Sequence, residues 1–91
     1  MARVLMYSAR LCGYCQMAER LLVAKGVTEI DKVLVDAVPE RRAEMIARSG
    51  RTSVPQIFIG DTHVGGYSEL AALDRQGQLE DYPEGQEELQ G

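Results

Sequence analysis

The sequence contains few of the residues that mark secreted, membrane-spanning or zinc-binding proteins. Its 91 residues include two cysteines, one histidine and no tryptophan. Two cysteines are too few for a small secreted scaffold held together by disulfides. No apolar run approaches the roughly 18 residues that a membrane-spanning helix needs, and the apolar stretch from Val4 is too short for a signal peptide. We therefore expect a cytoplasmic protein with no membrane association, in which both thiols are kept reduced.

The length and the charge distribution exclude further classes of protein. A chain of 91 residues accommodates one domain. Its 10 basic and 14 acidic residues give a formal net charge of -4, which argues against nucleic acid as a partner because no basic excess is present. Five of the acidic residues lie in residues 80–91, where no Lys or Arg occurs. The sequence thus predicts a single domain over residues 1–79 and a flexible acidic tail over residues 80–91.

Hydrophobic patterning predicts strands that alternate with helices. We expect strands over residues 4–7, 29–36, 56–59 and 62–64, and helices over about residues 13–25, 39–50 and 68–77. Gly60-Asp61 is a two-residue turn of the kind that joins hairpin strands. A helix between two strands implies a right-handed parallel crossover. The order β-α-β-α-β-β-α therefore predicts an α/β fold in which three helices cover a four-stranded mixed sheet.

Individual side chains in these elements carry further expectations. We expect Met6, Met17 and Met45 to lie in the core. The only histidine, His63, falls on an edge strand and is expected at the surface. Ser68 is expected to cap the third helix, because serine is among the preferred residues at a helix N-terminus.

The motif Cys12-Gly13-Tyr14-Cys15 is placed where the first strand leads into the first helix. The thiolate is the reactive form of cysteine, and a position at a helix N-terminus lowers a thiol pKa from about 8.5 to roughly 3.5–7.5. We expect Arg10 to add positive charge nearby. Residues three apart share one face of a helix, so both sulfurs lie together. Cys12 is the predicted exposed nucleophile and Cys15 the resolving thiol.

Other interpretations of the two cysteines are less consistent with the sequence. The simplest is a pair of ordinary core cysteines. A structural zinc site needs four ligands, which the two cysteines and His63 cannot supply. A phosphatase-type loop needs an arginine six positions after its cysteine, where this chain has Ala18 or Leu21. A redox-active pair is the interpretation that this position in a βα unit favours.

Two further segments have the composition of binding loops. In Thr52-Ser53-Val54-Pro55, the proline has no N–H and interrupts strand pairing, which leaves the Val54 backbone open to an extended peptide. A turn proline at the start of a strand is the alternative. In Gly65-Gly66-Tyr67-Ser68, two glycines allow close approach just before a helix N-terminus, where anions bind. A simple connection between hairpin and helix would use the same glycines.

These three motifs together resemble the glutaredoxin family, in its dithiol class of the small bacterial glutaredoxin 3 type. The resemblance extends over about residues 4–77 and is strongest at residues 12–15, 44–59 and 65–70. It implies a thioredoxin fold, glutathione as co-substrate and a cis peptide bond before Pro55. A thioredoxin proper usually has a tryptophan before its cysteine pair, and this chain has none.

The resemblance also implies roles for individual residues. Cys12 matches the family nucleophile and Cys15 the resolving thiol. The Val54 backbone would pair with the cysteine of glutathione, and Arg42 would reach its glycine carboxylate. The γ-glutamyl carboxylate would be held at the start of the third helix. The complete implied set of glutathione-binding residues is Tyr14, Arg42, Ser53, Val54, Pro55, Gly66, Tyr67 and Ser68.

The implied function is a monomeric, glutathione-dependent thiol–disulfide oxidoreductase that reduces protein disulfides and glutathione mixed disulfides. Gly13 departs from the family, which usually has proline there, and in glutaredoxin relatives the loss of this proline accompanies [2Fe-2S] binding. The alternative is therefore a dimer that shares a cluster through Cys12 of each chain and two glutathiones. Cys15 argues against the cluster, because a resolving thiol displaces a ligand. A third hypothesis is a domain used only for protein contacts.

Overall fold

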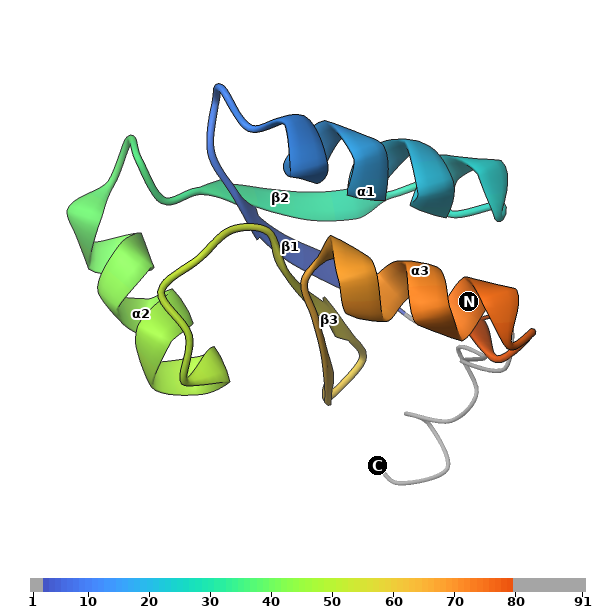
Figure 1. Ribbon diagram of the computed structural model, residues 1–91. Coiled ribbons are helices and arrows are strands. Elements are labelled where there is room, and N and C mark those ends of the chain that lie inside the picture. The colour runs from blue at the N-terminus through green and yellow to red at the C-terminus, as the bar shows by residue number, and fades with distance from the viewer. Residues whose placement is uncertain (1–2, 80–91) are drawn as a thin grey trace.

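The computed structural model describes residues 3–79 and contains strands and helices in the predicted order (Figure 1). The elements are β1 (Val4–Ser8), α1 (Gly13–Ala24), β2 (Ile30–Leu34), α2 (Pro39–Ser49), β3 (Gln56–Ile59), β4 (Thr62–Gly65) and α3 (Tyr67–Arg75). Pro39 opens α2, where its missing N–H removes no helical hydrogen bond. Gly50 ends α2 with φ +75°, a left-handed conformation that glycine adopts without a Cβ penalty.

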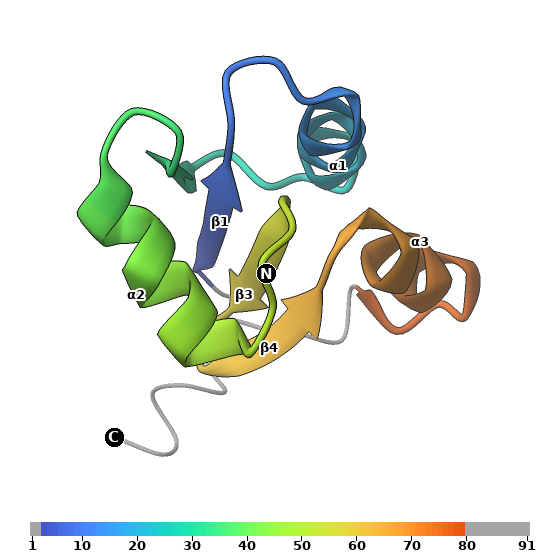
Figure 2. The same ribbon diagram turned by 60° about the vertical axis from the view of Figure 1, so that its left-hand side comes forward.

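The four strands form one mixed sheet in the order β2-β1-β3-β4. β1 runs parallel to β2 and antiparallel to β3, and β4 pairs antiparallel with β3. Helices α1 and α3 lie side by side over one face of the sheet, whereas α2 covers the other face (Figure 2). The four-stranded mixed sheet with three helices, predicted from the sequence, is confirmed.

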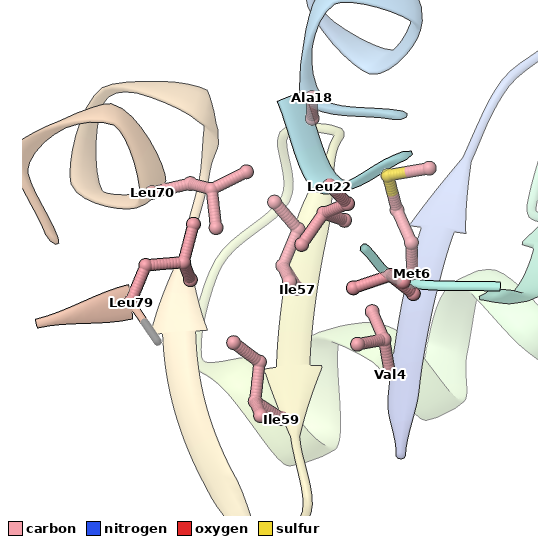
Figure 3. Close-up of a cluster of buried hydrophobic side chains, with 9 residues drawn as sticks. Val4, Met6, Ala18, Leu22, Ile57, Ile59, Leu70 and Leu79 are labelled. Carbon is pink, nitrogen blue, oxygen red and sulfur yellow. The ribbon is translucent and has the colours of Figure 1, made fainter. Parts of the chain in front are cut away.

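Successive side chains on the central strands point to opposite faces of the sheet, so the core is divided into two clusters. Val4 and Met6 on β1, and Ile57 and Ile59 on β3, point toward α1 and α3 (Figure 3). Helix α1 meets them with residues at helical spacing, among them Leu22. The larger core cluster therefore holds α1, with the cysteines at its N-terminal end, firmly against the sheet.

The opposite face of the sheet packs against α2 through a smaller cluster that includes Tyr7, Met45 and Phe58. The Tyr7 hydroxyl donates a hydrogen bond to Glu44 of α2 and accepts one from Arg48 at 3.0 Å. The Arg48 guanidinium also lies 4.6 Å from the Phe58 ring centroid. Burial, followed by the hydrogen bond to Glu44, raises the pKa of Tyr7 above its ordinary value. This polar network fixes α2 on the sheet.

Three expectations about individual side chains are wrong. Met17 is 42% exposed, because it lies beside rather than on the buried stripe of α1. His63 is partly buried: its Nε2 lies 2.8 Å from Gln56 Oε1, and its ring centroid is 4.8 Å from that of Phe58. Ser68 does not cap α3, which begins one residue earlier with Gly66 as N-cap.

The described chain ends inside the core. Leu79 is 1% exposed and belongs to the same cluster as Leu70 of α3 (Figure 3). The predicted tail at residues 80–91 lies outside the described residues, so the domain boundary at residue 79 stays a prediction. Between residues 3 and 79, no helix combines the length and the apolar character needed to cross a membrane.

Candidate active site

The cysteine pair lies at the N-terminus of α1. Cys12 is the N-cap residue, with extended backbone, and its sulfur accepts a hydrogen bond from the Cys15 N–H at 3.2 Å. The two sulfurs lie at disulfide distance, and the Cα atoms are 5.2 Å apart, within the usual range for a disulfide. Cys15 is 3% exposed, whereas Cys12 is only partly buried. Cys12 is therefore the sulfur that an incoming group reaches first.

The helix itself supplies the positive potential at Cys12. The first turn of α1 contains no acidic residue, and the free N–H groups there stabilise negative charge on the sulfur. Arg10 does not contribute as expected, because its Nε pairs with Asp36 Oδ2 at 3.1 Å. The backbone N–H of Arg10 also donates to this carboxyl, and together these contacts lower the pKa of Asp36.

The loop before β3 brings a carbonyl group to the cysteines. The Val54–Pro55 peptide bond is cis, as the resemblance implied, and the Val54 carbonyl oxygen lies 3.9 Å from Cys12 Sγ. Pro55 is buried, and the exposed Ser53 accepts a hydrogen bond from Gln56 Nε2 through its carbonyl at 3.0 Å. The loop thus presents main-chain atoms of residues far from Cys12 in the sequence.

Arg42 contacts this same loop from α2. Its Nη2 donates to the Thr52 carbonyl at 2.9 Å, and the residue is exposed. The side chain expected to reach glutathione therefore also supports the segment that carries Val54. The remaining guanidinium N–H groups make no hydrogen bond within residues 3–79, so they are available to an incoming carboxylate.

The start of α3 is held by a contact that the sequence analysis missed. The Gly66 N–H donates to Glu69 Oε1 at 2.7 Å, and this hydrogen bond is the main reason why the pKa of Glu69 is lowered. Arg51 lies 3.4 Å from the same carboxylate oxygen. Gly65 has φ +117°, and a Cβ there would come within 2.8 Å of Glu69 Oε1, so glycine is needed. A glutamate three residues after the cap is the spacing that predicts this contact.

The N-termini of α1 and α3 meet through their aromatic residues. The rings of Tyr14 and Tyr67 are stacked, with centroids 6.1 Å apart and an interplanar angle of 29°. Gly66 directly precedes Tyr67, and a Cβ on Gly66 would be 3.4 Å from the Pro55 carbonyl oxygen. The structure therefore brings Cys12, Tyr14, Val54, Pro55, Gly66 and Tyr67 together. Ser68 is exposed on the first turn of α3.

A cysteine pair at a helix N-terminus, opposite a cis-proline loop on this sheet, defines a thiol–disulfide oxidoreductase site of the thioredoxin fold. The glutaredoxin family model matches residues 4–64. A glutaredoxin from Neisseria meningitidis is 55% identical over 80 residues, which cover 88% of this chain and 94% of the relative. Glutaredoxin 3 from Escherichia coli is 48% identical over 80 residues, which cover 88% of this chain and 95% of that relative.

Solved structures agree with the sequence relatives. The solution structure of glutaredoxin from Brucella melitensis has a TM-score of 0.77 and 47% identity, with 89% of this chain and 87% of the other covered. The crystal structure of a buckwheat glutaredoxin–glutathione complex has a TM-score of 0.79 and 26% identity, with 87% and 74% covered. The chain belongs to the glutaredoxin family, whose members are generally thiol–disulfide oxidoreductases.

Proposed function

We propose that this protein reduces glutathione mixed disulfides and protein disulfides at the expense of glutathione. The observation that carries the proposal is the position of the Cys12 sulfur, at the N-terminus of α1 and 3.9 Å from the Val54 carbonyl oxygen. The similarity to a buckwheat glutaredoxin solved as a glutathione complex supports glutathione as the co-substrate. The cytoplasm as the place of action and a monomer as the working form are parts of this proposal.

Reduction of a glutathione mixed disulfide requires only Cys12. Its thiolate attacks the glutathione sulfur, a Cys12–glutathione disulfide forms, and the substrate thiolate leaves and takes up a proton. The thiolate of a second glutathione then attacks the glutathione sulfur of this intermediate. Oxidised glutathione leaves, and Cys12 returns as the thiolate that the α1 N-terminus stabilises.

Reduction of a protein disulfide also uses Cys15. Cys12 attacks one sulfur of the substrate and forms a mixed disulfide, which releases the first substrate thiol. The Cys15 thiolate then attacks Cys12 Sγ, the second substrate thiol leaves, and a Cys12–Cys15 disulfide remains. The spacing of the two Cα atoms, 5.2 Å, suits this intramolecular step. Two glutathiones reduce the pair again and leave as oxidised glutathione.

The residues around Cys12 support a binding mode for glutathione. The backbone of Val54 would pair with the cysteine of glutathione, between Ser53 and Pro55 of the same loop. The two carboxylates would go to Arg42 and to the N–H groups at the start of α3. The full proposed set is Tyr14, Arg42, Ser53, Val54, Pro55, Gly66, Tyr67 and Ser68.

Two cysteine variants test this proposal. Cys12→Ser is expected to abolish both activities, because an alcohol forms no mixed disulfide. Cys15→Ser is expected to keep the reduction of a glutathione mixed disulfide and to lose that of a protein disulfide which needs the second thiol. Both rates are measured with glutathione as reductant, and thermal unfolding of each variant provides the control for folding. Equal loss of both activities in Cys15→Ser would contradict this division of roles.

A shared [2Fe-2S] cluster is the second candidate, and Gly13 is the observation that favours it. A Cβ at Gly13 would have no atom within 4 Å, so the surface beside Cys12 is open to a second chain. Within residues 3–79 no group of three or more His, Cys, Asp or Glu residues is arranged to hold a metal, so a cluster would need ligands from two chains and glutathione. The proximity of Cys15 to Cys12 argues for the oxidoreductase.

A further inference from the structure

Large apolar side chains are unusually exposed next to the nucleophile. Leu11 is 98% exposed, Tyr14 63% and Met17 42%. These are three of the six large apolar residues that are exposed within residues 3–79, and all three lie within five positions of Cys12. Leu11 directly precedes the nucleophile, and Tyr14 follows it by two positions.

The fold does not account for the apolar character of Leu11. This residue occupies the position before the N-cap of α1, where an apolar side chain often packs against the fourth residue of the helix. That fourth residue is Gln16, which is polar and exposed. Leu11 is therefore left in solvent without an apolar partner on its own helix.

The charges near Leu11 do not oppose an apolar partner. Arg10, the preceding residue, is paired with Asp36 at 3.1 Å, and the first turn of α1 has no acidic residue. Tyr14, two positions after Cys12, is held by its stacking on Tyr67, so its ring presents a fixed apolar surface.

We propose that Leu11 and Tyr14 form a contact surface for polypeptide substrates in which a large apolar residue flanks the target cysteine. The inference rests on the proposed function and adds a substrate preference to it. In a glutathione mixed disulfide the substrate sulfur is the leaving group, one S–S bond beyond the glutathione sulfur that Cys12 attacks, so the residues beside the substrate cysteine come close to the residues beside Cys12. Leu11 is not among the proposed glutathione contacts, so the contact at Leu11 is made by the polypeptide, whereas Tyr14 also belongs to the proposed glutathione site.

Two peptides that differ at one position test the inference. Each carries a cysteine in mixed disulfide with glutathione, flanked by leucine in one peptide and by serine in the other. Burial of one leucine side chain corresponds to a preference of about tenfold in kcat/KM for the leucine peptide. Leu11→Ser is expected to reduce the preference to less than threefold, and Leu11→Met to retain most of it. A small mixed disulfide of glutathione and 2-mercaptoethanol is expected to react equally with all variants.

Val23→Ser is the matched control, because Val23 is 58% exposed near the other end of α1. It is expected to keep the full peptide preference. The inference is overturned if Leu11→Ser keeps that preference, if Val23→Ser loses it, or if Leu11→Ser slows the small disulfide as much as the leucine peptide. Absence of activity on the small disulfide in the unmodified protein would instead overturn the proposed function.

Discussion

Leu79 is the residue that tests where the folded domain ends. It is 1% exposed and packs in the cluster that contains Leu70 and Ile59, four positions after α3 ends at Arg75 (Figure 3). Replacing a buried leucine by alanine costs about 2–5 kcal/mol, from lost transfer free energy and the cavity left behind. A domain of this size has a total free energy of unfolding of about 5–15 kcal/mol. Leu79→Ala is therefore expected to remove a large fraction of the stability.

The assay is urea unfolding followed by far-ultraviolet circular dichroism, because the chain has no tryptophan to report by fluorescence. With a slope of about 1–3 kcal/mol per molar urea, the midpoint of Leu79→Ala should fall by about 1 M or more. The melting temperature should fall by about 10 °C or more. Leu11→Ala is the control: Leu11 is 98% exposed, and its replacement should change the free energy of unfolding by less than about 0.5 kcal/mol.

Two truncations test where the folded domain ends. Removal of residues 80–91 is expected to leave the urea midpoint nearly unchanged, whereas removal of residues 79–91 should reproduce the loss seen in Leu79→Ala. A Leu79→Ala protein as stable as the unmodified one would refute the argument from burial. Equal destabilisation by both truncations would show that the domain extends beyond residue 79.

Three other predictions concern the site. Because the Gly66 N–H lowers the pKa of Glu69, the stabilisation that this carboxylate provides is complete above pH 4.5 and is lost as the pH falls through its folded-state value. Glu69→Gln should therefore lower the melting temperature at pH 7, and the gap between the two proteins should shrink below pH 4.5. A gap of the same size at both pH values would contradict a stabilising role for the Glu69 charge. Arg42→Ala should raise the KM for glutathione roughly tenfold, because hydrogen bonds to charged groups contribute about 1.5–3 kcal/mol. The control Arg75→Ala, at another exposed arginine, should leave this KM unchanged. An unchanged KM in Arg42→Ala would contradict the proposed contact between Arg42 and glutathione. If a cluster binds, anaerobic reconstitution with iron, sulfide and glutathione should give a brown dimer that Gly13→Pro converts to a colourless monomer, whereas a colourless monomer from the unmodified protein would exclude the cluster.

Apart from the sheet and its three helices, the features that sequence analysis predicted correctly are local ones. The apolar run at residues 4–7 marked β1 because a buried strand needs successive apolar residues on both of its faces. Pro39 and Gly50 marked the two ends of α2, since each acts through its own backbone. The position of Cys12 at a strand–helix junction likewise follows from neighbouring residues.

The features that were missed depend on side-chain contacts between different elements. His63 was assigned to the surface because it falls on an edge strand, but the structure pairs it with Gln56 and places its ring on Phe58. Arg10 was expected to act on Cys12, but Asp36, which is 26 positions away, takes up its charge. The predicted hairpin brings His63 beside Phe58 but does not show that the histidine ring is covered, and nothing near Arg10 in the sequence indicates its pairing with Asp36.

The cap of α3 is a different case, because a local signal for it was present. Ser68 was chosen for its side chain, but a cap is defined by where the helical backbone begins, and that is decided by the glycine pair and Glu69. Glutamate three residues after Gly66 satisfies the cap N–H, and Arg51 from the cis-proline loop meets the same carboxylate. At Cys12, by contrast, the groups that stabilise a thiolate belong to the first turn of α1 alone. The proposed glutathione site is instead assembled from α1, α2, the loop before β3 and the start of α3, and the Arg51–Glu69 ion pair joins the last two of these segments.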